Sequence, residues 1–342
     1  MARPSTAKVI GQRVAGAIPS VIGVVIVTFI LTRALPGDPA AFFAGPAATP
    51  EAIAEIRRTL GLDRSLPEQF FRYLGDLFQG DLGMSLTTGQ TVVYDLMTRL
   101  PASLELTIAG LLLAIALALP LGILAATRPN SWIDHGVRLL ATAGVSLPTF
   151  FTGLFLVYLL YFRLGIAPAP LGRLDILYSA PPHVTGFYLI DSLLAGDLAT
   201  FGAALAQLAL PAVTLGLFAL APLARVTRAA MLGVLSSDFI RTARASGLPP
   251  RQVLFGYAFR NAMLPVITTL GIVFSFLLGA NILVEKVFAW PGIGSYAVEA
   301  LVASDYAPVQ GFVLTMALLY VVLNLLIDLL YVVIDPRAGV ET

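Results

Sequence analysis

Long apolar runs alternate with charged segments along the chain. Six runs are long enough to cross the hydrocarbon layer, which takes about 20 helical residues. They cover residues 14–32, 106–127, 139–162, 198–224, 261–284 and 306–327, and the last continues past Asp328 to residue 334. The pattern predicts an all-α membrane protein with six transmembrane helices. Residues 176–190 form a shorter apolar stretch interrupted by Pro181 and Pro182, which predicts a loop that touches the membrane surface.

The distribution of Lys and Arg predicts the direction of the spans, because cytoplasmic loops keep an excess of these residues. With the N-terminus inside, twelve of the 21 basic residues lie on the inner face, and the short outer loops hold only Arg163, Arg173 and Lys286. We therefore expect cytoplasmic N- and C-termini, a long extracytoplasmic loop at 34–104 and a cytoplasmic loop at 225–260. The first run follows basic residues as a signal peptide does, but its 19 residues favour a retained span over a cleaved signal.

Composition agrees with a membrane protein and excludes several kinds of chemistry. Hydrophobic residues make up 58% of the chain and charged residues 12%, and the net charge of +1 gives no reason to expect nucleic-acid binding. There is no cysteine, and the chain has only two histidines, so a metal site is not expected. The two lysines follow Ala7 and Glu285 rather than a glycine, which excludes a P-loop. We predict no catalytic, cofactor-binding or metal-binding residue, and hence no enzyme.

The long loop at 34–104 carries two helix-start signals. Thr49-Pro50-Glu51 offers an N-cap, a proline at the first helical position and an early acid, and residues 65–68 have the spacing of a capping box. Apolar residues follow each signal at helical spacing. Two short amphipathic helices are predicted, which either form a platform for a soluble partner or pack over the chain's own helices.

The loop at 225–260 contains six arginines and predicts a short helix. Ser236 or Ser237 can cap a helix that begins at Asp238, and Gly247 and the prolines that follow can end it. A second helix is expected at 250–261, before the fifth span. A short helix held below the membrane suits insertion into a groove of a partner protein. The alternative is a basic interfacial helix attracted to anionic membrane lipid.

Small and polar residues recur in the spans. Gly271, Ser275 and Gly279 lie four residues apart on one face of the fifth run, which favours close helix packing. Ser275 and Asn281 could instead line a translocation path, and the fifth run is the preferred pore helix because it leads directly from the loop at 225–260.

Residues 238–265 resemble the membrane subunits of binding-protein-dependent ABC importers, in the dipeptide, oligopeptide and nickel branch. Arg241-Thr242-Ala243 stands where the family carries Glu-Ala-Ala, and Gly247 stands at the family's glycine; the Glu is missing. Further segments similar to that branch occur in order along nearly the whole chain, at 35–39, 80–85, 99–106, 185–191 and 289–294.

The resemblance implies a single permease domain over residues 1–342 in the bacterial inner membrane. It also implies a homologous second permease subunit, two cytoplasmic ATPase subunits that bind ATP and Mg²⁺, and an extracytoplasmic solute-binding protein, with no cofactor in this chain. ATPase coupling would fall on Asp238, Arg241, Thr242, Ala243 and Gly247. Dipeptides, oligopeptides, glutathione and nickel chelates are all open as substrates. The competing hypothesis is a stand-alone secondary transporter or channel.

Overall fold

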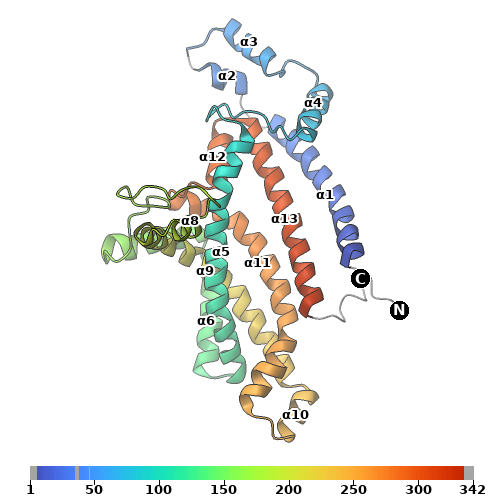
Figure 1. Cartoon of the computed structure of the whole chain (residues 1–342), viewed down its shortest axis with the longest axis vertical. Helices are drawn as coiled ribbons and strands as arrows, with labels where there is room; N and C mark the ends of the chain where they lie inside the picture. Colours follow the sequence, from blue (N-terminus) through green and yellow to red (C-terminus); the bar gives the residue numbers. More distant parts are fainter. Residues whose placement is uncertain (1–5, 35–37, 46, 335–342) are drawn as a thin grey trace. The chain divides into compact units, whose positions relative to one another are not determined.

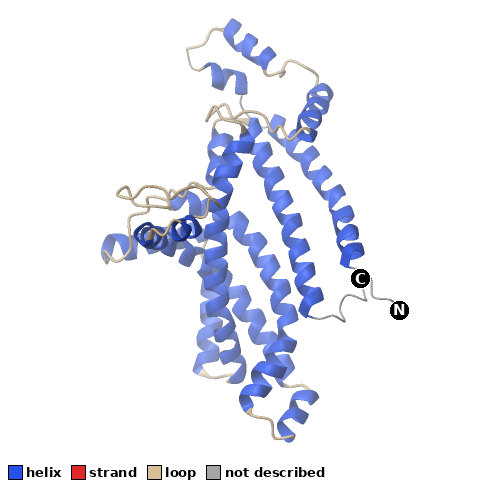
Figure 2. Cartoon of the chain, in the orientation of Figure 1, coloured by secondary structure: helices blue, strands red, loops and turns tan. Residues whose placement is uncertain are grey.

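The computed structural model describes residues 6–34, 38–45 and 47–334. Every regular element among these residues is a helix, joined by loops (Figure 2), and one isolated bridge pairs Met84 with Thr91. The predicted all-α class is confirmed. The chain divides into two compact units, which are described separately: one contains Ser103–Trp290 and the chain from Leu323 onward, and the other contains Thr6–Ala102 and Pro291–Val322.

Four helices among the described residues are long and apolar enough to cross a membrane. They are Val92–Thr127 (α5), Leu198–Leu235 (α9), Gln252–Val287 (the π-helix η2, Gln252–Phe259, followed by α11, Arg260–Val287) and Tyr306–Ile327 within α13 (Tyr306–Ile334). Helix α1, Thr6–Ala34, covers the first apolar run. The total of six spans stays a prediction.

The third apolar run is not the continuous helix that the sequence predicted. Helix α6 (Trp132–Ser146) is followed by α7 (Thr149–Leu156) and the π-helix η1 (Val157–Arg163), and the two halves are bent by 104°. Leu147 is extended, with φ −103° and ψ 134°, because Pro148 disfavours the helical conformation of the residue before it. The proline also has no N–H to continue the helix, so the chain breaks there.

Several helices extend beyond the apolar runs that predicted them. Helix α5 begins at Val92 rather than at residue 106, and α9 continues to Leu235 rather than ending at 224. Charged residues end an apolar run but not a helix, so the apolar length underestimates the helix. The prediction of a separate helix at 250–261 is also wrong, because η2 passes directly into α11. Pro265 lies inside α11 and does not end it.

Helix α9 is the centre of its unit and contacts α6, α7, α11 and α8 (Tyr188–Leu194). Its crossing with α5 depends on two glycines. A Cβ on Gly110 would lie 2.7 Å from Leu215 Cβ, and a Cβ on Gly216 would lie 2.9 Å from Leu113 Cδ2. Only hydrogen fits at either position, so the two backbones approach closely, as small residues allow between membrane helices.

The other unit contains residues 38–45 and 47–102, the described part of the long predicted loop up to Ala102, with its helices. The two predicted amphipathic helices are confirmed as α3 (Pro50–Thr59) and α4 (Leu66–Phe78), preceded by α2 (Pro39–Ala44). Thr49 Oγ1 accepts the Ala52 N–H at 3.3 Å, as an N-cap should. Ser65 occupies the N-cap of α4 but makes no side-chain cap bond, so the predicted capping box is wrong. A further helix, α12 (Ile293–Val302), was not predicted.

Candidate functional site

Helix α10, Asp238–Ala245, is the predicted short helix of the loop at 225–260, and it lies where α9 ends and η2 begins (Figure 1). Its start agrees with the prediction, since Ser237 is the N-cap residue with extended φ and ψ. The predicted side-chain cap is wrong, because Ser237 Oγ instead donates to the Val234 carbonyl at 2.6 Å. Asp238 in the first turn still complements the positive end of the helix dipole.

Gly247 ends α10 in the way that the sequence predicted. Its φ of +76° is left-handed, a conformation that glycine adopts without steric cost. The Gly247 N–H donates to the Arg244 carbonyl at 3.0 Å, and the Leu248 N–H reaches back to the Ala243 carbonyl at 3.4 Å. These two bonds form a Schellman motif, which satisfies carbonyls that the helix end would leave unpaired.

One face of α10 is fixed to the rest of its unit. Ile240 and Ala243 are buried in a hydrophobic cluster that joins α5, α9, η2 and α11. The other buried members of this cluster are Ile123, Ala126, Met231, Val253, Ala258 and Ala262. Since close-packed interiors transmit displacement rather than absorb it, α10 is mechanically connected to the ends of these helices.

The opposite face of α10 is polar and exposed. The side chains of Asp238 and Arg241 are 93% and 79% exposed and form an ion pair at 3.4 Å. Thr242 is also exposed, and its hydroxyl donates to the Asp238 carbonyl at 3.0 Å. An exposed ion pair of this kind adds about 0–1 kcal/mol to stability. The face is therefore free to bind a partner without loss to the fold.

The two predicted path residues have different surroundings. Ser275 is partly buried, and its hydroxyl donates to the Gly271 carbonyl at 3.1 Å. Asn281 is buried, and its Nδ2 lies 3.1 Å from each of three acceptors on α5 and α11: Ser103 O, Thr107 Oγ1 and Glu285 Oε1. The Asn281 Oδ1, also buried, has no hydrogen-bond partner in the part of the chain that the structure describes. Sequence reasoning missed this polar cluster because it used Glu285 to mark the end of a run.

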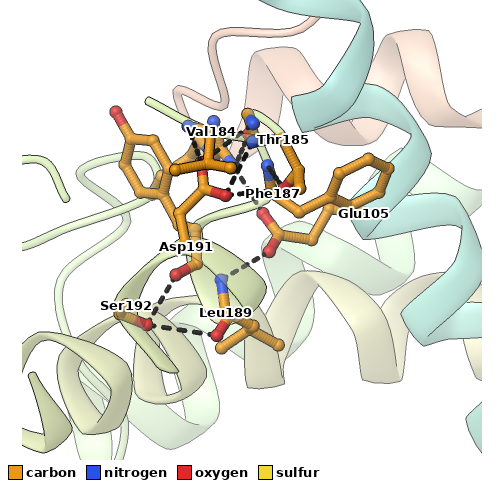
Figure 3. Close-up of polar contacts among 10 residues, drawn as sticks. Glu105, Val184, Thr185, Phe187, Leu189, Asp191 and Ser192 are labelled. Carbon is orange, nitrogen blue, oxygen red and sulfur yellow. Dashed lines mark hydrogen bonds and ion pairs between the residues drawn. The ribbon is translucent and has the colours of Figure 1, made fainter. Parts of the chain in front are cut away.

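The loop between η1 and α8 is held by a buried ion pair that was not predicted. Glu105 on α5 accepts a bond from Arg173 Nη2 at 2.6 Å and another from the Leu189 N–H at 2.9 Å (Figure 3). Arg173 also donates to the Gly186 carbonyl at 2.8 Å and stacks on the Tyr188 ring. The one signal in the sequence was the presence of both charges in segments that were otherwise apolar.

Asp191 organises the same loop from the first turn of α8. Its carboxylate accepts bonds from Thr185 N and Oγ1 at 2.8 and 2.6 Å and from the Gly186 N–H at 2.8 Å (Figure 3). Burial raises the pKa of Asp191, but these hydrogen bonds outweigh it and hold the pKa below its ordinary value. The segment predicted as a surface loop is therefore ordered by polar contacts, and α8 begins within it.

Most of the chain matches two descriptions of one protein family. Residues 118–340 match "Binding-protein-dependent transport system inner membrane component", and residues 7–107 match the N-terminal part of the same component. Both descriptions agree with the resemblance stated from residues 238–265.

Three curated relatives cover nearly the full length of the chain. It is 47% identical to the probable D,D-dipeptide transport system permease protein DdpB of Escherichia coli K12, over 97% of both chains. It is 44% identical to the di/tripeptide transport system permease protein DppB of Pseudomonas aeruginosa, over 96% of this chain and 97% of the relative. It is 40% identical to the dipeptide transport system permease protein DppB of Escherichia coli K12, over 95% and 97%. The chain therefore belongs to the family of inner membrane components of binding-protein-dependent transport systems.

Proposed function

We propose that this chain is the pore subunit of an ATP-driven importer of dipeptides or similarly small peptides. The observation that carries the proposal is α10, a helix anchored on one face, exposed on the other, and placed where the family motif lies. The names of the similar permeases support a small peptide as the substrate. ATP and Mg²⁺ would be bound by two separate ATPase subunits.

Coupling to the ATPases would use the exposed face of α10. Asp238, Arg241 and Thr242 present charge and hydrogen-bonding groups to a groove in the partner, and Gly247 allows the tight end of the helix. Ala243 acts from the other side, because its methyl group is buried in the cluster that fixes α10. A displacement of α10 by the ATPase would then move the ends of α5, α9 and η2 together.

The remaining partners would assemble around this chain in the membrane. A homologous second permease subunit supplies the other half of the path, and a solute-binding protein delivers the peptide from outside. The exposed helices α3 and α4, which have no buried residue, offer it a platform. This arrangement places the loop at 225–260 and both termini in the cytoplasm, although residues 1–5 and 335–342 lie outside the described residues.

Ser275 and Asn281 would border the translocation path on α11. The Oδ1 of Asn281 is an acceptor without a partner among the described residues, and it is buried, so a peptide N–H group or ammonium would reach it only when α5 and α11 move apart. The other contacts of Asn281 hold α5 against α11, so its amide would be positioned rather than free to rotate.

Reconstitution in liposomes tests this function. The chain is assembled with its second permease and ATPases, the binding protein is supplied on one side, and uptake of a labelled dipeptide is measured with and without ATP. We expect uptake only with all subunits and ATP. Competition by D,D-dipeptides, tripeptides, glutathione and a nickel chelate then ranks the substrates. ATP-independent uptake by this chain alone would support a stand-alone channel or secondary carrier instead.

A further inference from the structure

A cavity of about 670 Å³ lies beside α10, where two apolar helices end. Ala126 and Thr127 line it from the last turn of α5, and Leu232 and Leu235 line it from the last turn of α9. The apolar run of α5 ends together with the helix at Thr127, beside Arg128, whereas α9 continues 11 residues past the end of its apolar run at residue 224. The end of α5 therefore marks the level at which the chain leaves the hydrocarbon layer. The cavity is therefore at the membrane–water interface.

The walls of the cavity differ in chemistry. Leu248, Val253 and Leu254 extend the apolar wall formed by the two helix ends. Among the described residues, Arg244 of α10 is the one charged residue of the lining, and Ser236 adds a hydroxyl group. A cationic group above an apolar wall matches an amphiphile with an anionic head.

The charge around this cavity is unbalanced. Among the described residues, Arg241 pairs with Asp238, but no carboxylate pairs with Arg244. Arg128 and Arg251 are exposed and directly follow the lining residues Thr127 and Pro250 in the sequence. The segment 225–260 holds six arginines and one acid. No acidic residue in the described part of the chain lines the cavity, so a bound anion would meet no repulsion from the lining.

We infer that an anionic phospholipid of the cytoplasmic leaflet occupies this cavity. Its phosphate would bind Arg244, and its acyl chain would lie against Leu232, Leu235 and Leu254. Basic pockets between helix ends on the cytoplasmic side are the type of site that holds acidic lipid headgroups. A polar protein loop is less well matched, because Ala126, Leu232 and Leu235 at the ends of two long apolar helices form an apolar wall. The inference rests on the proposed function, which places the loop at 225–260 on the cytoplasmic side. The bound lipid would contact both α10 and the ends of α5 and α9.

Photolabelling of the full chain tests the site. The chain is placed in phosphatidylcholine vesicles that contain a minor fraction of photoactivatable phosphatidylglycerol, and labelled peptides are mapped by mass spectrometry. Label is expected on peptides that contain Thr127 and Leu254, and unlabelled phosphatidylglycerol should compete while phosphatidylcholine should not.

Three variants separate a specific site from general attraction to anionic lipid. Arg244→Gln should lower the labelling about fivefold, the effect of about one basic contact at a membrane surface. Arg241→Gln removes the same charge three residues away, from a side chain that is paired and outside the lining, and should lower labelling less than about twofold. Ser236→Trp keeps every charge but fills the cavity, and it should abolish the label at Leu254.

Two results would overturn the inference. Equal loss of label in Arg241→Gln and Arg244→Gln would mean attraction to the surface without a site. A benzophenone amino acid at position 127 of the assembled transporter that attaches only to an ATPase chain, and never to lipid, would mean that a protein segment fills the cavity. The photolabelling uses this chain alone. If no specific label appears while ATP-driven uptake by the assembled transporter is intact, the lipid site is rejected and the proposed function stands.

Discussion

The Asp134 carboxylate accepts hydrogen bonds from both Nε and Nη2 of Arg228, the latter at 2.7 Å from Oδ2. These bonds join the first turn of α6 to α9. Asp134 is fully buried, and it also accepts the Asn130 N–H at 2.9 Å. A two-bond arginine–carboxylate pair fixes distance and angle together. It therefore sets the position of α6 on the same helix that leads to α10.

Replacing Asp134 should destabilise this unit strongly. Asp134→Asn leaves the Arg228 cation without its counter-charge; because the Arg228 side chain is 21% exposed, we expect a loss of about 2–3 kcal/mol, below the about 3–5 kcal/mol of a fully buried pair. Thermal unfolding of the purified chain measures the loss. Arg138→Gln is the control, because that exposed side chain lies 3.7 Å from the same carboxylate and should change stability by less than about 1 kcal/mol. Equal effects of the two variants would show that the two-bond pair contributes nothing special.

Gly247→Leu should separate assembly from coupling. A non-glycine residue in the left-handed conformation costs about 1–2 kcal/mol, which leaves the spans folded. No atom of the chain lies within 4 Å of a Cβ at this position, so the new side chain would protrude toward a docking partner. We expect normal insertion and pairing with the second permease, and joint loss of uptake and of substrate-stimulated ATP hydrolysis.

The control for this variant is Gly233→Leu, at an exposed α9 position where a Cβ also meets nothing within 4 Å and where φ is ordinary. It should retain uptake. Normal ATP-driven uptake by Gly247→Leu would contradict the assignment of α10 as the coupling helix.

Gly271→Leu should disturb helix packing far more than Gly279→Leu. A Cβ on Gly271 would lie 2.1 Å from Ile327 Cδ1 and 3.1 Å from its Cγ1, whereas a Cβ on Gly279 has nothing within 4 Å. Overpacking of this kind costs about 1–3 kcal/mol. Thermal unfolding of the two variants measures the difference, and equal midpoints would argue against tight packing at Gly271.

The loop around Asp191 should loosen in acid. The folded-state pKa of Asp191 lies below its ordinary value, so its stabilisation is complete above the unfolded pKa of about 3.9 and is lost as the pH falls through the folded value. Hydrogen exchange of the Thr185 and Gly186 amides, corrected for intrinsic rate, should stay constant above about pH 5 and accelerate below about pH 4.

Asp191→Asn should remove this acid response and expose both amides at neutral pH. Asp175→Asn is the control in the same loop, where the carboxylate accepts the Leu177 N–H at 3.1 Å. Retention of the response in Asp191→Asn would assign it to another group.

Charge reversal on the platform should weaken binding of the solute-binding protein. Glu68→Lys changes an exposed α4 side chain whose contact with Arg64 is long, at 3.7 Å, so the fold should be unaffected. We expect association with the binding protein to slow by about three- to tenfold at low salt, because rim charges act mainly on the association rate. Arg57→Glu on α3 should also slow association, but it breaks the ion pair between Arg57 and Asp38 at the N-cap of α2, so the fold of this variant is checked first by circular dichroism. Unchanged association rates in both variants would favour helices that only cover their own unit.

Local signals in the sequence determined the helix starts and ends that depend on one or two residues. Thr49 and Pro50 fix the start of α3, and Gly247 fixes the end of α10, because capping and a left-handed turn are properties of neighbouring residues. Hydropathy determined the all-α class, and the segment at residues 238–265, together with the other similar segments in order along the chain, indicated the family.

Tertiary structure decided what depends on residues far apart in the chain. Nothing local indicates that Glu105 pairs with Arg173, that Asp134 pairs with Arg228, or that Asn281 donates to Ser103. In the sequence, Glu105 only marked the edge of an apolar run, Asp134, Arg173 and Arg228 lay between runs, and Asn281 lay within one. A buried polar group must find a partner because burying it without one is costly, and only the folded chain shows which partner is within reach. The same limit applies to Ala243: the motif places it at the coupling segment, but packing decides that its methyl group is buried in the cluster beneath α10.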